Sequence, residues 1–242
     1  MKIISIIFLL ASIALPLSLQ AAEEDESRNH ALAFYLWGAG LDGHVGNKAG
    51  GLPVDVSFHD ILDNLEGVLM VNYRGEFDNW SLTSDLVYMN IVPSSGRPSA
   101  TLDVEQTTWE VSVGYEIQPG LELLGGFRYV DLKTALTLDF IMPSPPTIKT
   151  QEDWVDPIVG LDYRTALSDK WVFFGRADIG GFGVGSELTW QLGAYFSYKP
   201  SPNWKLFGGY RHLVWDFEAD DANQFFYDMA ISGPLLGVGY LF

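Results

Sequence analysis

The sequence predicts an all-β protein whose antiparallel strands close into a transmembrane barrel, and three observations support that prediction. Apolar residues recur at every second position over most of the chain, which is the period of a strand with one apolar face. Aromatic residues make up 14% of the chain and gather near the ends of these segments. Short polar turns alternate with longer polar loops, as in barrels that cross a membrane.

Residues 1–22 have the layout of a cleaved secretory signal peptide. A positive start is followed by an apolar run at residues 3–19 and then by small residues. Pro16 favours cleavage over anchoring because it breaks a spanning helix, and a retained anchor is the alternative. We therefore expect an exported chain with a single barrel domain over residues 23–242.

Ten strands are expected, at residues 31–43, 66–77, 80–92, 102–117, 121–138, 154–166, 171–182, 188–199, 204–217 and 227–242. An even number returns both ends of the chain to one side of the membrane. Eight strands is the alternative, because the glycine-rich stretch 180–185 is also compatible with irregular structure. The longer loops, which we expect to face outward, are residues 44–65, 93–101, 139–153, 183–187 and 218–226.

Within a strand, one set of alternate positions is apolar and the other is charged. Trp204, Leu206 and Tyr210 alternate with Lys205 and Arg211, for example. A soluble β-sandwich would bury the apolar face in its core, whereas a membrane barrel turns it to lipid. Aromatic residues at the ends of the apolar face favour the barrel, because Trp and Tyr concentrate at bilayer interfaces. The expected aromatic girdle consists of Trp80, Tyr88, Tyr115, Tyr129, Trp171 and Trp204.

The chain ends on alternating apolar residues with a terminal aromatic: Leu236, Val238, Tyr240 and Phe242. This ending resembles the C-terminal insertion signal of Gram-negative outer-membrane barrels. Together with the signal peptide and the hairpin pattern, the resemblance covers essentially the whole mature chain. It is a resemblance to a class, the small outer-membrane barrels of the opacity-protein and OmpA-like type, rather than to one protein.

The resemblance implies a location in the cell outer membrane and contact with its lipid and lipopolysaccharide. It also implies biogenesis through periplasmic chaperones and the barrel-assembly machinery, which reads the last strand by strand pairing. The sequence indicates no ligand, receptor or solute.

Charged residues occupy the face that we expect to line the lumen. They are Arg74, Glu76, Asp85, Glu110, Glu116, Glu122, Arg128, Asp156, Asp162, Arg164, Arg176, Asp178, Lys205 and Arg211. Because an unpaired buried charge costs several kcal/mol, these residues must pair across strands or stay hydrated. A barrel of this size is little wider than one that its side chains fill, so we expect a network of ion pairs that supports the wall. A narrow, weakly cation-selective channel is the alternative.

Composition and motifs exclude several other functions. The 242 residues hold 14 Lys and Arg against 31 Asp and Glu, and the net charge of −17 excludes a nucleic-acid partner. The chain has no cysteine, which removes disulfides, thiolate metal sites and cysteine nucleophiles. We expect no cofactor and no metal, because the glycine pairs lie inside strands and the acidic stretch 216–221 lacks the spacing of an EF-hand.

An enzyme is not expected, and no catalytic residue is assigned. His212 is the nearest approach to the histidine of an outer-membrane lipid- or peptide-processing enzyme, and we expect no serine beside it on the same face. We therefore expect an outer-membrane barrel with a structural or surface-interaction role. Within the first long loop, Ser57 and Asp60 predict the capped start of a short helix with Phe58, Ile61, Leu62 and Leu65 on one face.

Overall fold

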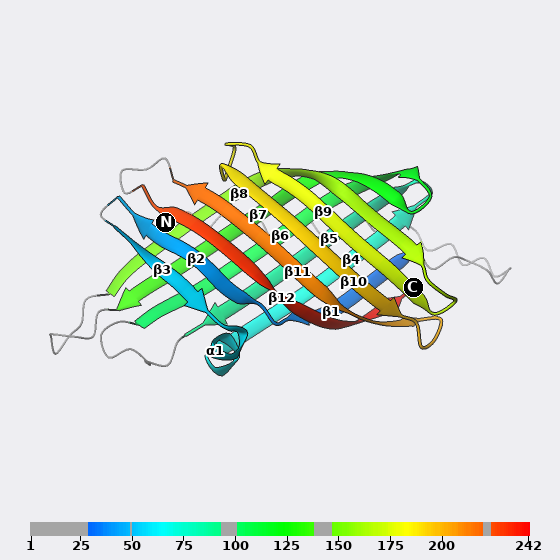
Figure 1. Ribbon diagram of the computed structural model, residues 1–242, viewed down its shortest axis with the longest axis horizontal. Coiled ribbons are helices and arrows are strands. Elements are labelled where there is room, and N and C mark those ends of the chain that lie inside the picture. Colours follow the sequence, from blue (N-terminus) through cyan, green and yellow to red (C-terminus); the bar gives the residue numbers. More distant parts are fainter. Residues whose placement is uncertain (1–28, 49, 93–100, 138–146, 220–223) are drawn as a thin grey trace, which may run out of the picture.

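The computed structural model describes residues 29–242 except residue 49 and the segments 93–100, 138–146 and 220–223. The predicted signal peptide, residues 1–22, lies outside the described residues. Figure 1 shows one antiparallel barrel with strongly tilted strands. Its elements are β1 (His30–Trp37), β2 (Gly40–Asn47), β3 (Gly50–Val56), α1 (Phe58–Asp63), β4 (Leu65–Phe77), β5 (Trp80–Ile91), β6 (Thr101–Gln118), β7 (Leu121–Thr137), β8 (Thr147–Ala166), β9 (Trp171–Gly181), β10 (Leu188–Tyr198), β11 (Trp204–Glu218) and β12 (Phe226–Leu241).

The sheet closes on itself because β1 pairs with both β4 and β12. β1 and β2 run in succession along β12, with a break at Gly38 and Ala39, and together make one strand of the wall. β3 pairs with β2 outside the closed ring. The twelve segments of the described chain therefore give a ten-stranded wall, which confirms the prediction.

The eight-stranded alternative is wrong. β9 and β10 pair along their whole length, from Trp171 opposite Tyr198 to Gly181 opposite Leu188. The glycines at the top of β9 therefore continue the strand. The irregular part of this hairpin is confined to the turn that follows, in which Phe182 and Gly183 both have positive φ.

The barrel has a turn end and a loop end. At the turn end, short connections join β4 to β5, β6 to β7, β8 to β9 and β10 to β11. The barrel seam also closes there: the His30 amide donates to the Phe242 carbonyl at 3.0 Å, and the Phe242 amide donates to the His30 carbonyl at 2.9 Å. The loop end, at the left of Figure 1, carries the longer connections and α1.

Two of the predicted outward loops contain more strand than expected. In the loop predicted at 44–65, β2 continues to Asn47 and β3 folds back along it, because β12 extends far enough to supply a partner for β2. In the loop predicted at 139–153, β8 begins at Thr147, opposite Thr137 of β7. The sequence did not predict either extension because apolar and polar residues alternate only weakly in these segments, although their backbones pair.

The predicted short helix is confirmed as α1. Ser57 is its N-cap: the Asp60 amide donates to the Ser57 hydroxyl, while the Ser57 amide and hydroxyl donate to the Asp60 carboxylate at 3.2 and 2.6 Å. These bonds satisfy donors that the first turn of a helix leaves unpaired. Ile61 is buried and joins α1 to the interior of the barrel, whereas Phe58 is 44% exposed. The side chains of Leu62 and Leu65 are outside the described set.

The wall is higher on one side than on the other. β6, β7 and β8 have 18, 17 and 20 residues, whereas β9 and β10 have 11 each. β8 pairs with β9 only from Ile158 onward, so within the described chain its segment 147–157 pairs with β7 alone. Pro157, which has no amide hydrogen, lies where this one-sided pairing ends.

Strand alternation divides the side chains between the outside and the lumen. The outward side chains form an apolar belt, whose exposed members include Leu32, Phe34, Leu36, Leu69, Val113, Leu123, Val159, Leu161, Ile179, Leu192, Phe196, Leu206, Leu236 and Val238. Aromatic rings edge this belt at the turn end, where Trp80 packs on Tyr115 with ring centroids 4.8 Å apart. In the described part of the chain, no helix is long and apolar enough to cross a membrane.

Candidate functional site

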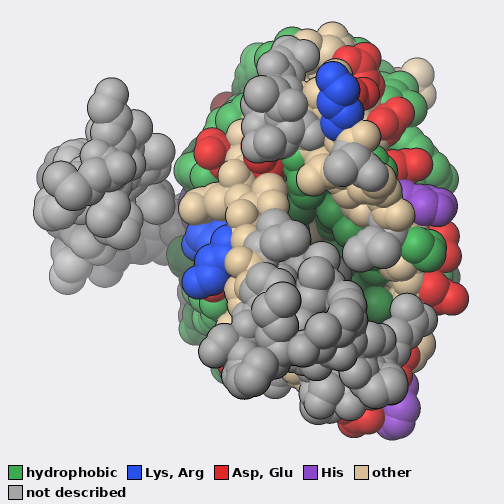
Figure 2. All heavy atoms as spheres, turned by 90° about the vertical axis from the view of Figure 1, so that its left-hand side faces the viewer, with side chains coloured by type: hydrophobic (Ala, Val, Ile, Leu, Met, Phe, Trp, Pro, Cys, Tyr) green, Lys and Arg blue, Asp and Glu red, His purple; other side chains and the backbone are tan. Residues whose placement is uncertain are grey.

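The loop-end half of the lumen is filled by apolar side chains, which we call the apolar layer. Its buried members are Trp37, Met70, Val87, Met89, Ile91, Val130, Leu132, Trp154, Leu213, Trp215, Phe217, Tyr227, Met229 and Ile231. Trp154 stacks on Phe217 with centroids 4.0 Å apart, and Trp215 is 1% exposed. Figure 2, which looks onto the loop end, shows acidic side chains at the rim and hydrophobic side chains further in. Such packing leaves little room for water.

Sequence reasoning missed the apolar layer, although a signal for it was present. In β11, Leu213, Trp215 and Phe217 continue the alternate positions that begin with Lys205 and include Arg211. The inward face therefore changes from charged to apolar along a single strand. The parity of a position reports whether a side chain points inward, but not whether the space it enters holds water.

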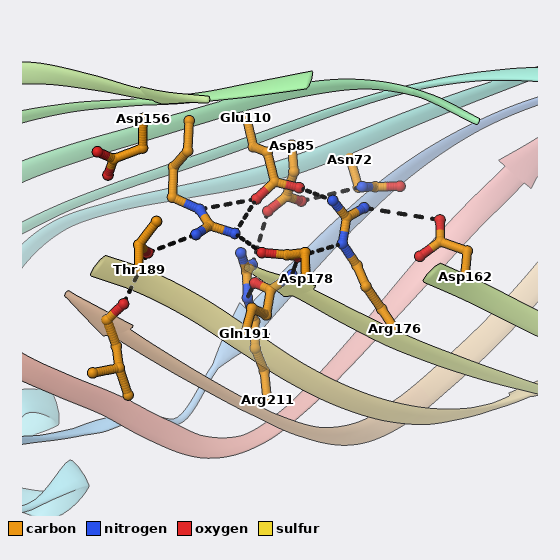
Figure 3. A network of polar contacts seen from close by, with 12 residues as sticks. Asn72, Asp85, Glu110, Asp156, Asp162, Arg176, Asp178, Thr189, Gln191 and Arg211 are labelled. Atoms are coloured by element: carbon orange, nitrogen blue, oxygen red, sulfur yellow. Dashed lines mark hydrogen bonds and ion pairs between the residues drawn. The ribbon is translucent and has the colours of Figure 1, made fainter. Parts of the chain in front are cut away.

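Below the apolar layer, an ion-pair layer crosses the lumen, and Figure 3 shows its members Glu110, Arg176 and Asp178 close together. Arg128 is the centre of this layer, because it pairs with both Glu110 and Asp178. The Arg128 side chain is 0% exposed. Its Nε and Nη2 donate to Glu110 at 3.0 and 2.8 Å, and Nη2 also donates to Asp178 at 2.7 Å. Its Nη1 donates to the Thr189 hydroxyl at 2.8 Å. These partners come from β6, β9 and β10, so one β7 guanidinium joins four strands of the wall.

A second guanidinium completes the pairing of the same carboxylates. Arg176 contacts the other oxygen of Glu110, and its Nε donates to Asp178 at 3.0 Å. Figure 3 shows Arg176 pointing toward Asp162 on its far side, at an ion-pair distance of 3.9 Å. Glu110 and Asp178 therefore each have two cationic partners, which offsets the cost of removing these carboxylates from water.

Arg211 connects the ion-pair layer to the barrel seam. Its Nη1 donates to Asp85 at 2.8 Å, and its Nε donates to Gln191 at 2.6 Å. The Tyr35 hydroxyl donates to the same Asp85 carboxylate at 2.9 Å. The guanidinium carbon lies 4.9 Å from the centre of the Trp37 ring, a cation–π contact that joins this layer to the apolar layer. Tyr35 and Gln191 carry no charge, so the predicted set of charged lumen residues did not include them.

A third cluster lies nearer the turn end. Arg74 contacts Glu122 and Asp162, and its Nε donates to Glu76 at 3.1 Å. Arg164 contacts the same Glu76 oxygen. The structure thus brings most of the predicted lumen residues into three connected groups around Arg128 with Arg176, Arg211, and Arg74.

Three predicted lumen residues lie outside these groups. Asp156 is buried and accepts from the Trp154 indole at 3.1 Å and from the Ser186 amide at 2.6 Å, so its partners are neutral. Glu116 accepts from the Gly120 amide in the β6–β7 turn at 2.8 Å. Lys205 faces a cavity, and no carboxylate of the described residues is in ion-pair contact with it.

The cavity has a volume of about 900 Å³ and occupies the turn-end half of the lumen. Tyr35, Asp85 and Arg211 of the ion-pair layer line its inner end. Asn29, His30, Lys199, Pro202 and Leu241 line it where the chain reaches the turn end. Its walls therefore lead from the middle of the barrel to the rim.

The predicted girdle and insertion residues point outward. Trp80, Trp171 and Trp204 are about half exposed at the turn end, and the rings of Trp171 and Trp204 pack on Tyr198 and Tyr240. Tyr115 joins them, whereas Tyr88 and Tyr129 are partly buried further along β5 and β7. The C-terminal residues Leu236, Val238, Tyr240 and Phe242 are all exposed on the outer face.

His212 is the nearest approach that the sequence offers to a catalytic histidine. Its ring lies on the outer face, 4.8 Å from that of Trp190. The expectation that no serine lies beside it is wrong, because Ser232 on β12 is its register partner. Alternation within β11 alone does not reveal a neighbour on another strand. Among the described residues, no group of three or more His, Asp or Glu side chains could hold a metal ion.

No protein-family model matches the sequence, and no curated protein matches it. The fold is similar to the translocator domain of the autotransporter NalP from Neisseria meningitidis, at 14% identity over 90% of each chain with a TM-score of 0.47. It is also similar to the outer membrane protease OmpT from Escherichia coli, at 10% identity over 90% of this chain and 99% of that one, with a TM-score of 0.46. Ail, the attachment invasion locus protein of Yersinia pestis, is 12% identical over 88% of this chain and 97% of that one, with a TM-score of 0.42. These likenesses concern architecture alone.

The architecture is that of a Gram-negative outer-membrane β-barrel protein with buried charged residues. The wall is closed and has an even number of strands, and its outer face is an apolar belt edged by aromatic rings. The charged groups of the ion-pair layer pair with one another, and buried apolar side chains line the loop-end half.

Proposed function

We propose that the protein is a non-conducting and non-enzymatic barrel of the cell outer membrane with a structural and surface-interaction role in the envelope. In this proposal the turn end faces the periplasm and the loop end faces outward. The apolar belt contacts lipid and lipopolysaccharide. The tall hairpins of β6, β7 and β8 stand above the membrane, since about 9–11 residues suffice to cross it.

The observation that supports the proposal is the apolar layer. A conduction path from the cavity to the loop end would have to pass side chains such as Leu213, Trp215 and Ile231, each 1% exposed. Ions do not enter a packed apolar region, because their desolvation is not compensated there. The narrow cation channel that the acidic composition suggested is therefore the less favoured function.

Conductance across planar lipid bilayers tests this proposal. The refolded protein should give no reproducible unitary steps, and Trp215→Ala, which opens space in the apolar layer, should introduce brief ones. Leu236→Ala, on the lipid face, is the matched control and should leave the bilayer silent. Unitary steps from the unaltered protein that change with Asp85→Ala would instead establish a channel.

The enzymatic alternative is tested with phospholipid, lipopolysaccharide and peptide substrates. We expect no turnover by the refolded protein. Turnover that His212→Ala abolishes, and that Tyr210→Ala on the same face of β11 leaves intact, would contradict the non-enzymatic role.

Biogenesis by periplasmic chaperones and the barrel-assembly machinery is part of the proposal, with the last strand as the recognised element. Phe242→Ala keeps the backbone bonds to His30 while removing the terminal ring. We expect this variant to reach the outer membrane in lower amounts, while its unfolding free energy after refolding stays close to that of the unaltered protein. Normal surface levels would contradict the role of the terminal ring.

A further inference from the structure

Cations are concentrated around the cavity to a degree unusual for this chain. Six of the 14 Lys and Arg residues line it, against three of the 31 Asp and Glu residues. The six are Arg74, Arg164, Arg176, Lys199, Lys205 and Arg211, and the three are Glu76, Asp85 and Glu110. Among the described residues that line the cavity, cations therefore outnumber acids, in contrast to the net charge of −17 of the whole chain.

The arginines and the lysines of the cavity differ in their partners. Each of the four arginines is in contact with at least one carboxylate. Neither Lys199 nor Lys205 has a carboxylate of the described residues in ion-pair contact. The unmatched positive charge of the cavity is therefore that of two lysines near the turn end.

Lys205 is held inside the mouth of the cavity by the strand opposite. Its register partner is Gly239, and a Cβ atom at that position would lie 2.6 Å from Cε of the lysine. The aliphatic part of Lys205 thus passes across a backbone that has no side chain, and its ammonium group reaches the lumen. A partly buried ammonium group that no described carboxylate pairs is unfavourable, and a carboxylate would relieve that cost.

Carboxylates lie close in the sequence to residues that line this mouth. Residues 23–26 are Glu-Glu-Asp-Glu, and they precede Asn29 and His30, which themselves line the cavity. An extended residue spans about 3.4 Å, so three residues of chain are enough to bring Glu26 to within about 10 Å of the rim. A tether of this length gives an effective concentration of the order of millimolar, which favours the chain's own acids over a dilute anion from solution.

We propose that the cavity is a docking site for the acidic segment 23–26 of the same chain, whose carboxylates pair with Lys199 and Lys205. The segment then occupies the lumen from the turn end, while the apolar layer fills it from the loop end. This inference does not depend on whether the barrel conducts, because it concerns only the half of the lumen below the ion-pair layer.

Disulfide trapping tests the inference directly, because the chain has no cysteine of its own. Asp25→Cys is combined with Ser197→Cys, which lines the cavity, or with Phe196→Cys, the next residue of β10, which is 49% exposed on the outer face. Under mild oxidation of the outer-membrane protein, we expect the Ser197 pair to form a disulfide at least tenfold faster than the Phe196 pair. Equal rates would overturn the proposal, including the outcome in which another anion occupies the cavity.

The role of charge is tested in the same background. Removing the charges on either side should lower the rate of disulfide formation in the Ser197 pair toward that in the Phe196 pair. On the segment, the change is the triple substitution Glu23→Gln, Glu24→Gln and Glu26→Gln. In the cavity, it is Lys199→Gln combined with Lys205→Gln. Lys170→Gln, on the exposed β8–β9 turn, is the matched control and should leave the rate unchanged. Heat-modifiable gel mobility verifies that each variant is folded. If the rate of disulfide formation in folded protein is unchanged by both sets of substitutions, the proposed pairing is overturned.

Discussion

The two halves of the lumen are formed by the same strands but are stabilised by different interactions. In the loop-end half, most inward side chains are aromatic or aliphatic, and they are buried against one another. In the turn-end half, inward side chains are charged and surround a cavity of about 900 Å³. The ion-pair layer around Arg128 separates the two, with its central guanidinium 0% exposed.

The difference teaches that a barrel interior need not be of one kind. The apolar layer stabilises the barrel as the core of a soluble protein does, through burial and close packing. The charged half is stabilised only where each group has a partner, because an unpaired charge in the same place would be strongly unfavourable. Substitutions in the two halves should therefore differ in size and in cause.

The largest effect is expected from Arg128→Met. This change removes the guanidinium that Glu110 and Asp178 share and leaves their carboxylates with a single cation, Arg176. Breaking a buried pair in this way costs about 3–5 kcal/mol of unfolding free energy, which urea unfolding in lipid vesicles measures. Lys133→Gln is the control, because Lys133 and Glu105 form an exposed pair worth less than about 1 kcal/mol. Similar losses in both variants would remove the distinction between the ion-pair layer and an ordinary surface pair.

A somewhat smaller effect is expected from Leu213→Ala in the apolar layer. Leu213 is 1% exposed, and its truncation should leave a cavity that costs about 2–5 kcal/mol. Leu236→Ala, at a position 73% exposed on the lipid face, should cost clearly less in the same unfolding measurement. If the lipid-facing change proved the more damaging, the loop-end half would not act as a packed core.

The smallest effect concerns the cap of α1, above the apolar layer. The bonds from the Ser57 hydroxyl and amide hold the pKa of Asp60 below its usual value. A lowered pKa in the folded state contributes stability that is present above the ordinary aspartate pKa and is lost as the pH falls through the lowered one. We expect hydrogen exchange at the Ile61 amide, which donates to the Ser57 carbonyl, to quicken beyond its intrinsic pH dependence below about pH 4. Asp60→Asn should abolish this additional acceleration of exchange. If the acceleration persists in that variant, a group other than Asp60 is responsible for it.

The wall could be predicted from the sequence because its signal is local and repeated. Alternation over ten segments, turn residues such as Asn79 and Gly120, and the capping pair Ser57 and Asp60 each act within a few residues of chain. β3 was not predicted, since it pairs only with β2 in the described chain, and β2 in turn continues along the extended β12.

The site could be predicted only in part. Alternation placed Arg128 and Glu110 on the inward face, but it gave no distances around the barrel, so the sharing of Glu110 between Arg128 and Arg176 was not predictable. Predicting the apolar layer would have required knowing which inward residues of different strands lie at the same height in the barrel. That information lies in the register and tilt of the closed sheet.

The one-sided pairing of β8 affects whether two molecules of this protein can associate through their strand edges. An exposed strand edge offers amide and carbonyl groups on which a second chain can add. Over residues 147–153 this edge carries Lys149, Glu152 and Asp153. Further along, the Ser186 amide of the β9–β10 turn donates to Asp156, and Pro157, which cannot donate, ends the one-sided stretch. Charges and proline are the features that discourage such addition. The taller side of the barrel can thus stand in water beside its neighbours without nucleating an intermolecular sheet.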